Sequence, residues 1–193
     1  MTLKNLVNDF LKQYGEQKEE ELKFYQCYKD DPKTLCYLVG WAKKSNGKTH
    51  PHQYRISTSV KSYLEKFLFE NFNTIQKLTE FDDLLNLLVR IKGMKQLTAF
   101  DAATRIGVCF KLSPKKVYIH RGAYKGAKVL LGNKIRGRNF LYMHELPPEL
   151  QTLTPLQAED FLCIYKDDFL KMGIPTKSCY VESQTKTTIC YNQ

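Results

Sequence analysis

Ile91-Lys92-Gly93-Met94-Lys95-Gln96-Leu97-Thr98-Ala99 separates two apolar segments of the chain. Apolar residues on both sides recur at helical spacing: Leu84, Leu85, Leu87, Leu88 and Val89 before it, and Ala102, Ala103, Ile106 and Val108 after it. The pattern predicts two helices joined by a tight hairpin, in which Gly93 supplies backbone freedom that a residue with a Cβ lacks.

The start of the second helix is suited to an anion. Its first N–H groups have no partner within the helix, and a phosphate can accept them. We therefore expect the hairpin to contact nucleic acid through Lys92, Gly93, Lys95 and Thr98. The alternative is a glycine turn in a helical bundle that touches no phosphate.

Charge favours the first interpretation. The 193 residues carry a formal net charge of +10. Between Lys92 and Arg138 there are twelve Lys and Arg but only one acidic residue, Asp101. Such a concentration of positive charge favours a polyanionic partner, and we expect nucleic acid, with a nucleotide as a second possibility.

The remaining composition gives few functional signals. No stretch approaches the roughly twenty apolar residues that span a bilayer, so we expect a cytoplasmic protein with no membrane partner. The six cysteines have no C-x-x-C spacing, and we expect neither a metal site nor a cofactor. Cys179 and Cys190 lie in a polar tail that could hold a disulfide if the protein were exported.

The periodicity predicts a mainly α fold. We expect one helical domain over 1–170, with an N-terminal layer at about 1–75, a helix-hairpin-helix part at about 76–140 and a closing segment at 141–170, followed by a polar tail at 171–193 that forms a short strand or is disordered. The expected helices are Leu3–Tyr14 with Gly15 as its stop, one starting at Asp31-Pro32, Ser59–Phe72, Phe81–Ile91, Thr98–Phe110, one starting at Ser113-Pro114, and one starting at Thr154-Pro155.

The hairpin resembles that of a known superfamily. Gly93-Met94-Lys95-Gln96-Leu97-Thr98-Ala99 is similar to the G-h-G-x-K-T-A element of the helix-hairpin-helix DNA glycosylases of the endonuclease III type. Val117-Tyr118-Ile119-His120 stands about where that superfamily has V-D-T-H at the start of a helix, and Gly132 falls near its later R-L-G. The resemblance covers about half the chain and implies a glycosylase-like helical bundle that binds DNA.

Three departures from that pattern bear on function. Lys95 replaces the second hairpin glycine, Leu97 stands at the lysine that forms a Schiff base in bifunctional members, and Tyr118 stands at the catalytic aspartate. A leucine forms no Schiff base, and a phenol with a pKa of about 10 is a poor substitute for a carboxylate. The alignment implies that the usual lyase and glycosylase chemistry is absent. Asp101 is a nearby carboxylate, and pairing with Arg105 at i+4 is its expected role.

A second motif lies upstream, at Gly47-Lys48-Thr49-His50-Pro51-His52-Gln53-Tyr54-Arg55. Together with Leu97–Asp101, Arg105–Gly107 and Val117–His120 it resembles a family of uncharacterised bacterial proteins marked by G-K-x-H-x-H-Q-x-R, which implies a fold but no reaction. Pro51 disfavours a helix, so we expect an extended segment. Its two imidazoles could converge with Gln53 and Arg55 to bind phosphate, relay protons or, with His120 or another ligand, hold a metal, or they could simply structure the loop.

The segment Val117–Gly126 adds cations and aromatic rings. Glycines beside Arg121 and Lys125 suit a loop that lies against a polyanion, and Tyr118 and Tyr124 could stack on bases or belong to the core. Lys134, Arg136 and Arg138 extend the basic surface.

Three hypotheses follow from the sequence. The first is a nucleic-acid-binding protein without the usual glycosylase chemistry. The second is an enzyme on nucleic acid or nucleotides with His50, His52, Arg55 and His120 as catalytic residues. The third is a protein-interaction or structural helical domain, which a buried Lys95 hairpin would favour.

Overall fold

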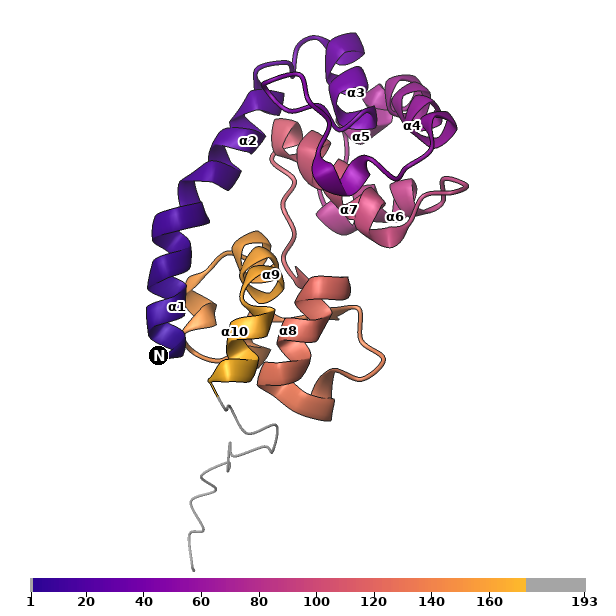
Figure 1. Cartoon of the computed structure of the whole chain (residues 1–193). Helices are drawn as coiled ribbons and strands as arrows, with labels where there is room; N and C mark the ends of the chain where they lie inside the picture. The colour runs from indigo at the N-terminus through magenta and orange to yellow at the C-terminus, as the bar shows by residue number, and fades with distance from the viewer. Residues whose placement is uncertain (1, 173–193) are drawn as a thin grey trace, which may run out of the picture.

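The computed structural model describes residues 2–172 (Figure 1), which are mainly helical. The helices and strands are α1 (Leu3–Phe10), α2 (Glu16–Gln26), α3 (Pro32–Gly40), α4 (Thr58–Glu70), α5 (Phe72–Ile75), α6 (Phe81–Val89), α7 (Gln96–Gly107), β1 (Val117–Tyr118), α8 (Arg121–Leu131), β2 (Phe140–Leu141), α9 (Pro155–Ile164) and α10 (Lys166–Lys171). Short 3₁₀ turns lie between them, among them η2 (Pro51–Gln53) and η5 (Met143–Glu145). The predicted strand or disorder of the tail lies outside the described residues from 173 onward.

Several helices begin where the sequence predicts, because their first residues satisfy the N-terminal N–H groups. The Asp31 side chain accepts a hydrogen bond from the Thr34 N–H, with Pro32 in the first turn of α3. Thr154 and Gln157 form a capping box at the start of α9. The helices predicted at Ser59–Phe72, Phe81–Ile91 and Thr98–Phe110 are confirmed as α4, α6 and α7, with ends shifted by a few residues.

The predicted helix stop at Gly15 is wrong. Gly15 has right-handed helical dihedrals, and a π-helical turn over Leu11–Gly15 joins α1 directly to α2. Gly15 is buried, so packing holds the turn together despite the low helix propensity of glycine. The combined helix runs along one side of the molecule (Figure 1).

Two other local predictions are also wrong. Ser113-Pro114 starts no helix but leads into β1, which pairs antiparallel with β2. The segment that we expected to be extended around Pro51 contains the 3₁₀ turn η2, since proline is also compatible with the first position of a helical turn.

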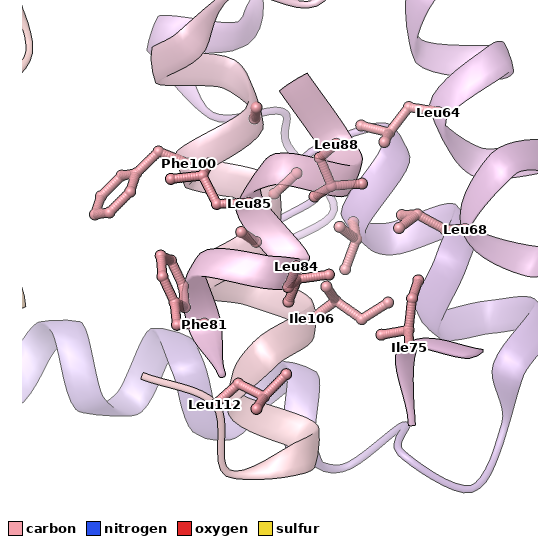
Figure 2. Packing of buried hydrophobic residues seen from close by; sticks show 14 of the residues in the cluster. Leu64, Leu68, Ile75, Phe81, Leu84, Leu85, Leu88, Phe100, Ile106 and Leu112 are labelled. Carbon is pink, nitrogen blue, oxygen red and sulfur yellow. The ribbon is translucent and has the colours of Figure 1, made fainter. Parts of the chain in front are cut away.

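The side chains form two hydrophobic cores. The first is built mainly by α3–α7, which we call the central lobe, and Figure 2 shows Leu84, Leu88 and Ile106 packed together in it. The second is built by α1 and α8–α10, which we call the terminal lobe. The terminal lobe therefore combines both ends of the described chain, and the predicted succession of layers at about 1–75, 76–140 and 141–170 does not coincide with the two cores.

Two connections link the lobes. The α1–α2 helix is one of them, and the chain from Leu112 to His120 is the other (Figure 1). Within the terminal lobe α8 packs very closely on α9 at Gly126. A Cβ added at this glycine would lie only 2.1 Å from the carbonyl oxygen of Leu162, so only a residue without a side chain fits there. The N-terminus of α7 in the central lobe and the N-terminus of α8 in the terminal lobe both lie near the end of the connecting chain, at Ile119 and His120.

Candidate nucleic-acid interface

A groove with a volume of about 870 Å³ is lined by residues of both lobes. Four segments contribute: the chain entering α4, the hairpin between α6 and α7, the start of α8 and the loop before β2. The lining residues are Arg55, Ile56, Ser57, Val60, Gly93, Lys95, Gln96, Leu97, Thr98, Ile119, His120, Arg121, Tyr124, Gly137, Arg138 and Asn139. Four of these described residues are Arg or Lys and none is Asp or Glu, so we call this site the basic groove.

The hairpin has the geometry that its sequence predicts. Gly93 has a φ of +84°, which residues with a Cβ rarely adopt. A Cβ at Gly93 would also lie 2.9 Å from Cγ2 of Val60, so the turn is packed against α4. Lys95 is exposed and stands at the N-cap of α7. The hairpin thus presents a cation at the surface of the groove.

Helices α7 and α8 both begin at the basic groove without a side-chain cap. Lys95 precedes α7 and His120 precedes α8, and neither side chain accepts a hydrogen bond from its helix. Because helix N-termini carry partial positive charge and unpaired N–H groups, each favours an anion. Two such ends at one groove reinforce the charge of its Arg and Lys side chains.

His120 lies deep in the wall of the groove. Its side chain is only 8% exposed, and its ring packs against Phe100 with the centroids 5.1 Å apart. Burial lowers the pKa of His120, although the charge of Asp101 partly opposes the shift. The Nε2 atom is buried and has no hydrogen-bond partner within the described residues. A neutral imidazole with an unused nitrogen thus stands next to the first turn of α8.

The cations of the groove differ in how they are paired. Arg138 forms a bidentate ion pair with Glu145, with distances of 2.5 and 2.7 Å. For Arg55, Lys95 and Arg121 there is no ion pair with any residue in the range 2–172. These three exposed side chains therefore leave positive charge in the groove that a ligand would neutralise.

His50 lies outside the lining of the groove. Its Nε2 atom is 3.0 Å from Oε1 of Glu21 on α2, and Arg105 lies 3.9 Å from the same oxygen. Arg105 also pairs with Asp101 at 4.0 Å, as the i+4 spacing predicts. Burial acts to raise the pKa of Glu21, but the contact with His50 and the charges of Lys18 and Arg105 outweigh it, and the pKa is lowered. His50 thus contacts a cluster of charged side chains that joins η2 to α2 and α7.

The structure divides the predicted site residues. Gly93, Lys95, Thr98 and Arg121 come together in the basic groove, and Arg55 and His120, proposed as catalytic, join them there. Lys92 is exposed in the hairpin but does not line the groove, and His52 belongs to η2. Lys125 lines a separate cavity of about 570 Å³ with Lys128 and Lys166. Lys125 lies about one turn further along α8 than Arg121, and so farther from the N-terminal end of the helix that lines the groove.

Sequence reasoning missed other residues of the groove. Ser57, Gln96 and Asn139 line it, but an isolated polar residue in a sequence carries no signal of its surroundings. Tyr118 is not available for stacking on a base, because its ring is buried against Phe81 and Phe100 and its hydroxyl donates a hydrogen bond to Asp82. Tyr124 is half-buried and lines the groove.

The described residues contain neither a metal-binding cluster nor a membrane-spanning helix. In the range 2–172, no three His, Cys, Asp or Glu side chains gather in a way that could hold a metal ion. In the same range, no helix combines the length and apolar character needed to cross a membrane.

A comparison of the chain with protein-family models, curated proteins and solved structures found no match.

Proposed function

We propose that this protein binds nucleic acid, with DNA as the first candidate, in the basic groove between its lobes. The observation that carries the proposal is the joint presence, around one groove, of three cations with no ion-pair partner within residues 2–172 and of two helix N-termini without a side-chain cap. Phosphate oxygens accept hydrogen bonds from both kinds of group, and a nucleic-acid strand carries one phosphate per nucleotide, so a single ligand offers several acceptors.

The shape of the site supports a polymer over a small anion. Its lining comes from four segments and both lobes, so cations such as Lys95 and Arg121 approach the ligand from different elements. Contacts of this kind position the phosphate backbone and do not read a sequence. We therefore propose binding with little sequence preference.

We further propose that binding occurs without the lyase and aspartate-assisted chemistry of the glycosylases that the hairpin resembles. Leu97, in the position of the Schiff-base lysine, lines the groove and offers no nucleophile. Tyr118, in the position of the aspartate, has its hydroxyl engaged with Asp82, and burial raises its pKa further above the ordinary tyrosine value.

The two alternative functions receive less support. An enzyme that uses His50, His52, Arg55 and His120 together needs these groups around one cavity, whereas His50 is engaged with Glu21 and lies outside the lining of the groove. A structural or protein-interaction role for the hairpin predicts a buried turn, whereas Lys95 is exposed.

The test is a binding titration followed by fluorescence anisotropy. Labelled duplex DNA, single-stranded DNA and RNA are titrated with the wild-type protein and with Lys95→Glu and Arg121→Glu. Lys33→Glu, at an exposed lysine on α3, is the matched control with the same charge change. We expect salt-sensitive binding that both groove variants weaken and the control retains. Equal affinity for all four proteins would reject the groove as the contact site.

A further inference from the structure

Tyr142 and His144 form an exposed aromatic pair after β2. Their ring centroids lie 5.6 Å apart with an angle of 9° between the planes, which is an offset stack. The Tyr142 side chain is 45% exposed, and His144 is exposed as well. Two flat rings thus stand parallel at the surface of the molecule.

The pair is tied to the wall of the basic groove through Glu145. One carboxylate oxygen of Glu145 accepts the backbone N–H of Tyr142 at 2.7 Å, and the same carboxylate holds Arg138, a lining residue of the groove. The hydrogen bonds from Arg138 and the Tyr142 N–H lower the pKa of Glu145 to about 2. The carboxylate therefore stays ionised at neutral pH and keeps η5 fixed beside the groove.

Phe140 connects the aromatic pair to the protein core. The ring of Phe140 meets Tyr142 edge to face, with centroids 5.5 Å apart, and Phe140 in turn lies against the buried Tyr118. This column of rings from the core to the surface restricts the motion of Tyr142. A pre-positioned ring loses little conformational freedom when another flat group stacks on it.

We propose that Tyr142 and His144 are a stacking platform for unpaired bases of the nucleic-acid strand whose phosphates bind in the basic groove. Aromatic rings beside a basic groove are the combination that single strands require, since every base has a flat face and every nucleotide a phosphate. The ligand class is therefore a nucleic acid with unpaired or displaced bases. This inference rests on the proposed function of the groove.

The experiment compares two labelled probes of equal length and equal charge. One is a single strand of thymidine nucleotides, and the other is a strand of abasic nucleotides. Each is titrated with the wild-type protein and with Tyr142→Ala, His144→Ala and Tyr142→Phe. The matched control is Tyr37→Ala, because Tyr37 is 42% exposed and lies against Trp41 on the central lobe, away from the groove. Thermal melting of each variant verifies its fold.

We expect the wild-type protein to bind the thymidine strand roughly 5- to 100-fold more tightly than the abasic strand. Tyr142→Ala should lose most of this preference, His144→Ala should reduce it, and Tyr142→Phe and Tyr37→Ala should retain it. All variants should keep the same affinity for the abasic strand, since the cations of the groove are intact.

Two results would overturn the inference, and they differ in what they leave standing. The platform would be rejected if the wild-type protein bound both probes equally, or if Tyr142→Ala and His144→Ala kept the full wild-type preference for the thymidine strand over the abasic strand. If Lys95→Glu still weakened binding in that case, the groove would stand. No binding of either probe would also remove the platform; the groove would stand if duplex DNA still bound and Lys95→Glu weakened that binding, and it would be rejected if duplex DNA did not bind either.

Discussion

The side-chain amide of Gln53 donates a hydrogen bond of 2.7 Å to the carboxylate of Asp101, across 48 positions of the sequence. Gln53 is buried at the end of η2, two residues before Arg55 of the basic groove. Asp101 lies on α7, whose N-terminal residues also line the groove. One hydrogen bond thus fixes two walls of the proposed site relative to each other.

Replacing Gln53 by alanine tests this connection. Gln53→Ala leaves the Asp101 carboxylate without its shortest hydrogen bond, and we expect a loss of about 1–3 kcal/mol in the free energy of unfolding. Urea denaturation measures the change. Gln17→Ala, at an exposed position of α2, should stay within about 0.5 kcal/mol of the wild-type value. An unchanged midpoint for Gln53→Ala would show that the contact does not stabilise the fold.

Gly93 combines a positive φ with a close neighbour, and the two effects can be separated. Gly47 has a similar φ of +74°, but nothing lies within 4 Å of a Cβ added there. We expect Gly47→Ala to cost about 1–2 kcal/mol for the left-handed backbone alone. Gly93→Ala should cost more, because its methyl group must also displace Val60. Equal losses in urea denaturation would contradict the packing of the hairpin against α4.

Gly126 and Gly15 are both helical glycines, yet their variants should move stability in opposite directions. Gly126→Ala places a methyl group against the Leu162 carbonyl oxygen, so α8 and α9 must separate, at a cost of about 1–3 kcal/mol or more. At Gly15 the nearest atom to an added Cβ is 3.8 Å away, which is ordinary contact. Gly15→Ala should therefore gain about 0.5–1 kcal/mol from helix propensity. Thermal melting measures both, and a stabilised Gly126→Ala would refute the close approach.

Glu159 on α9 makes stability depend on pH. Burial and the neighbouring charge of Asp160 raise its pKa above the ordinary value of 4.5, against the opposing charge of Lys18. The folded state then holds a proton that the unfolded state releases, so the free energy of unfolding falls as the pH rises above 4.5.

Glu159→Gln removes this titration. Relative to the wild-type protein, the variant should become progressively more stable as the pH rises from 4.5 toward neutrality. Urea denaturation at a series of pH values measures the difference between the two proteins. A difference that is constant across the series would show that the carboxyl group of Glu159 titrates alike in both states.

The predictable parts of the fold are those that local sequence determines. Caps at Asp31 and Thr154 and the hairpin glycine satisfy or free the backbone within a few residues, and helices α3, α9 and α7 begin accordingly. At Gly15 the same local reasoning fails, because burial in the tertiary structure outweighs its low helix propensity.

Individual residues of the candidate site, in the hairpin and at Arg55, His120 and Arg121, were predictable from the sequence, but the way these distant segments come together was not. The hairpin residues Gly93, Lys95 and Thr98 lie together in the groove, as their spacing suggests. The contact of His50 with Glu21 joins positions 29 residues apart, and the acidic run that contains Glu21 has the pattern of a solvent-exposed helix. Such long-range pairing depends on how the lobes pack, which periodicity does not encode.

The most direct test of phosphate binding in the basic groove is the salt dependence of the affinity for duplex and single-stranded DNA. It is measured for the wild-type protein and for a triple variant that combines Arg55→Ala, Lys95→Ala and Arg121→Ala. If phosphates bind in the basic groove, the logarithm of the affinity falls linearly with the logarithm of the salt concentration, and the triple variant binds more weakly with a shallower slope, by about one for each contact removed. The same slope and affinity in both proteins would contradict the account, because nucleic acid would then bind elsewhere or not at all.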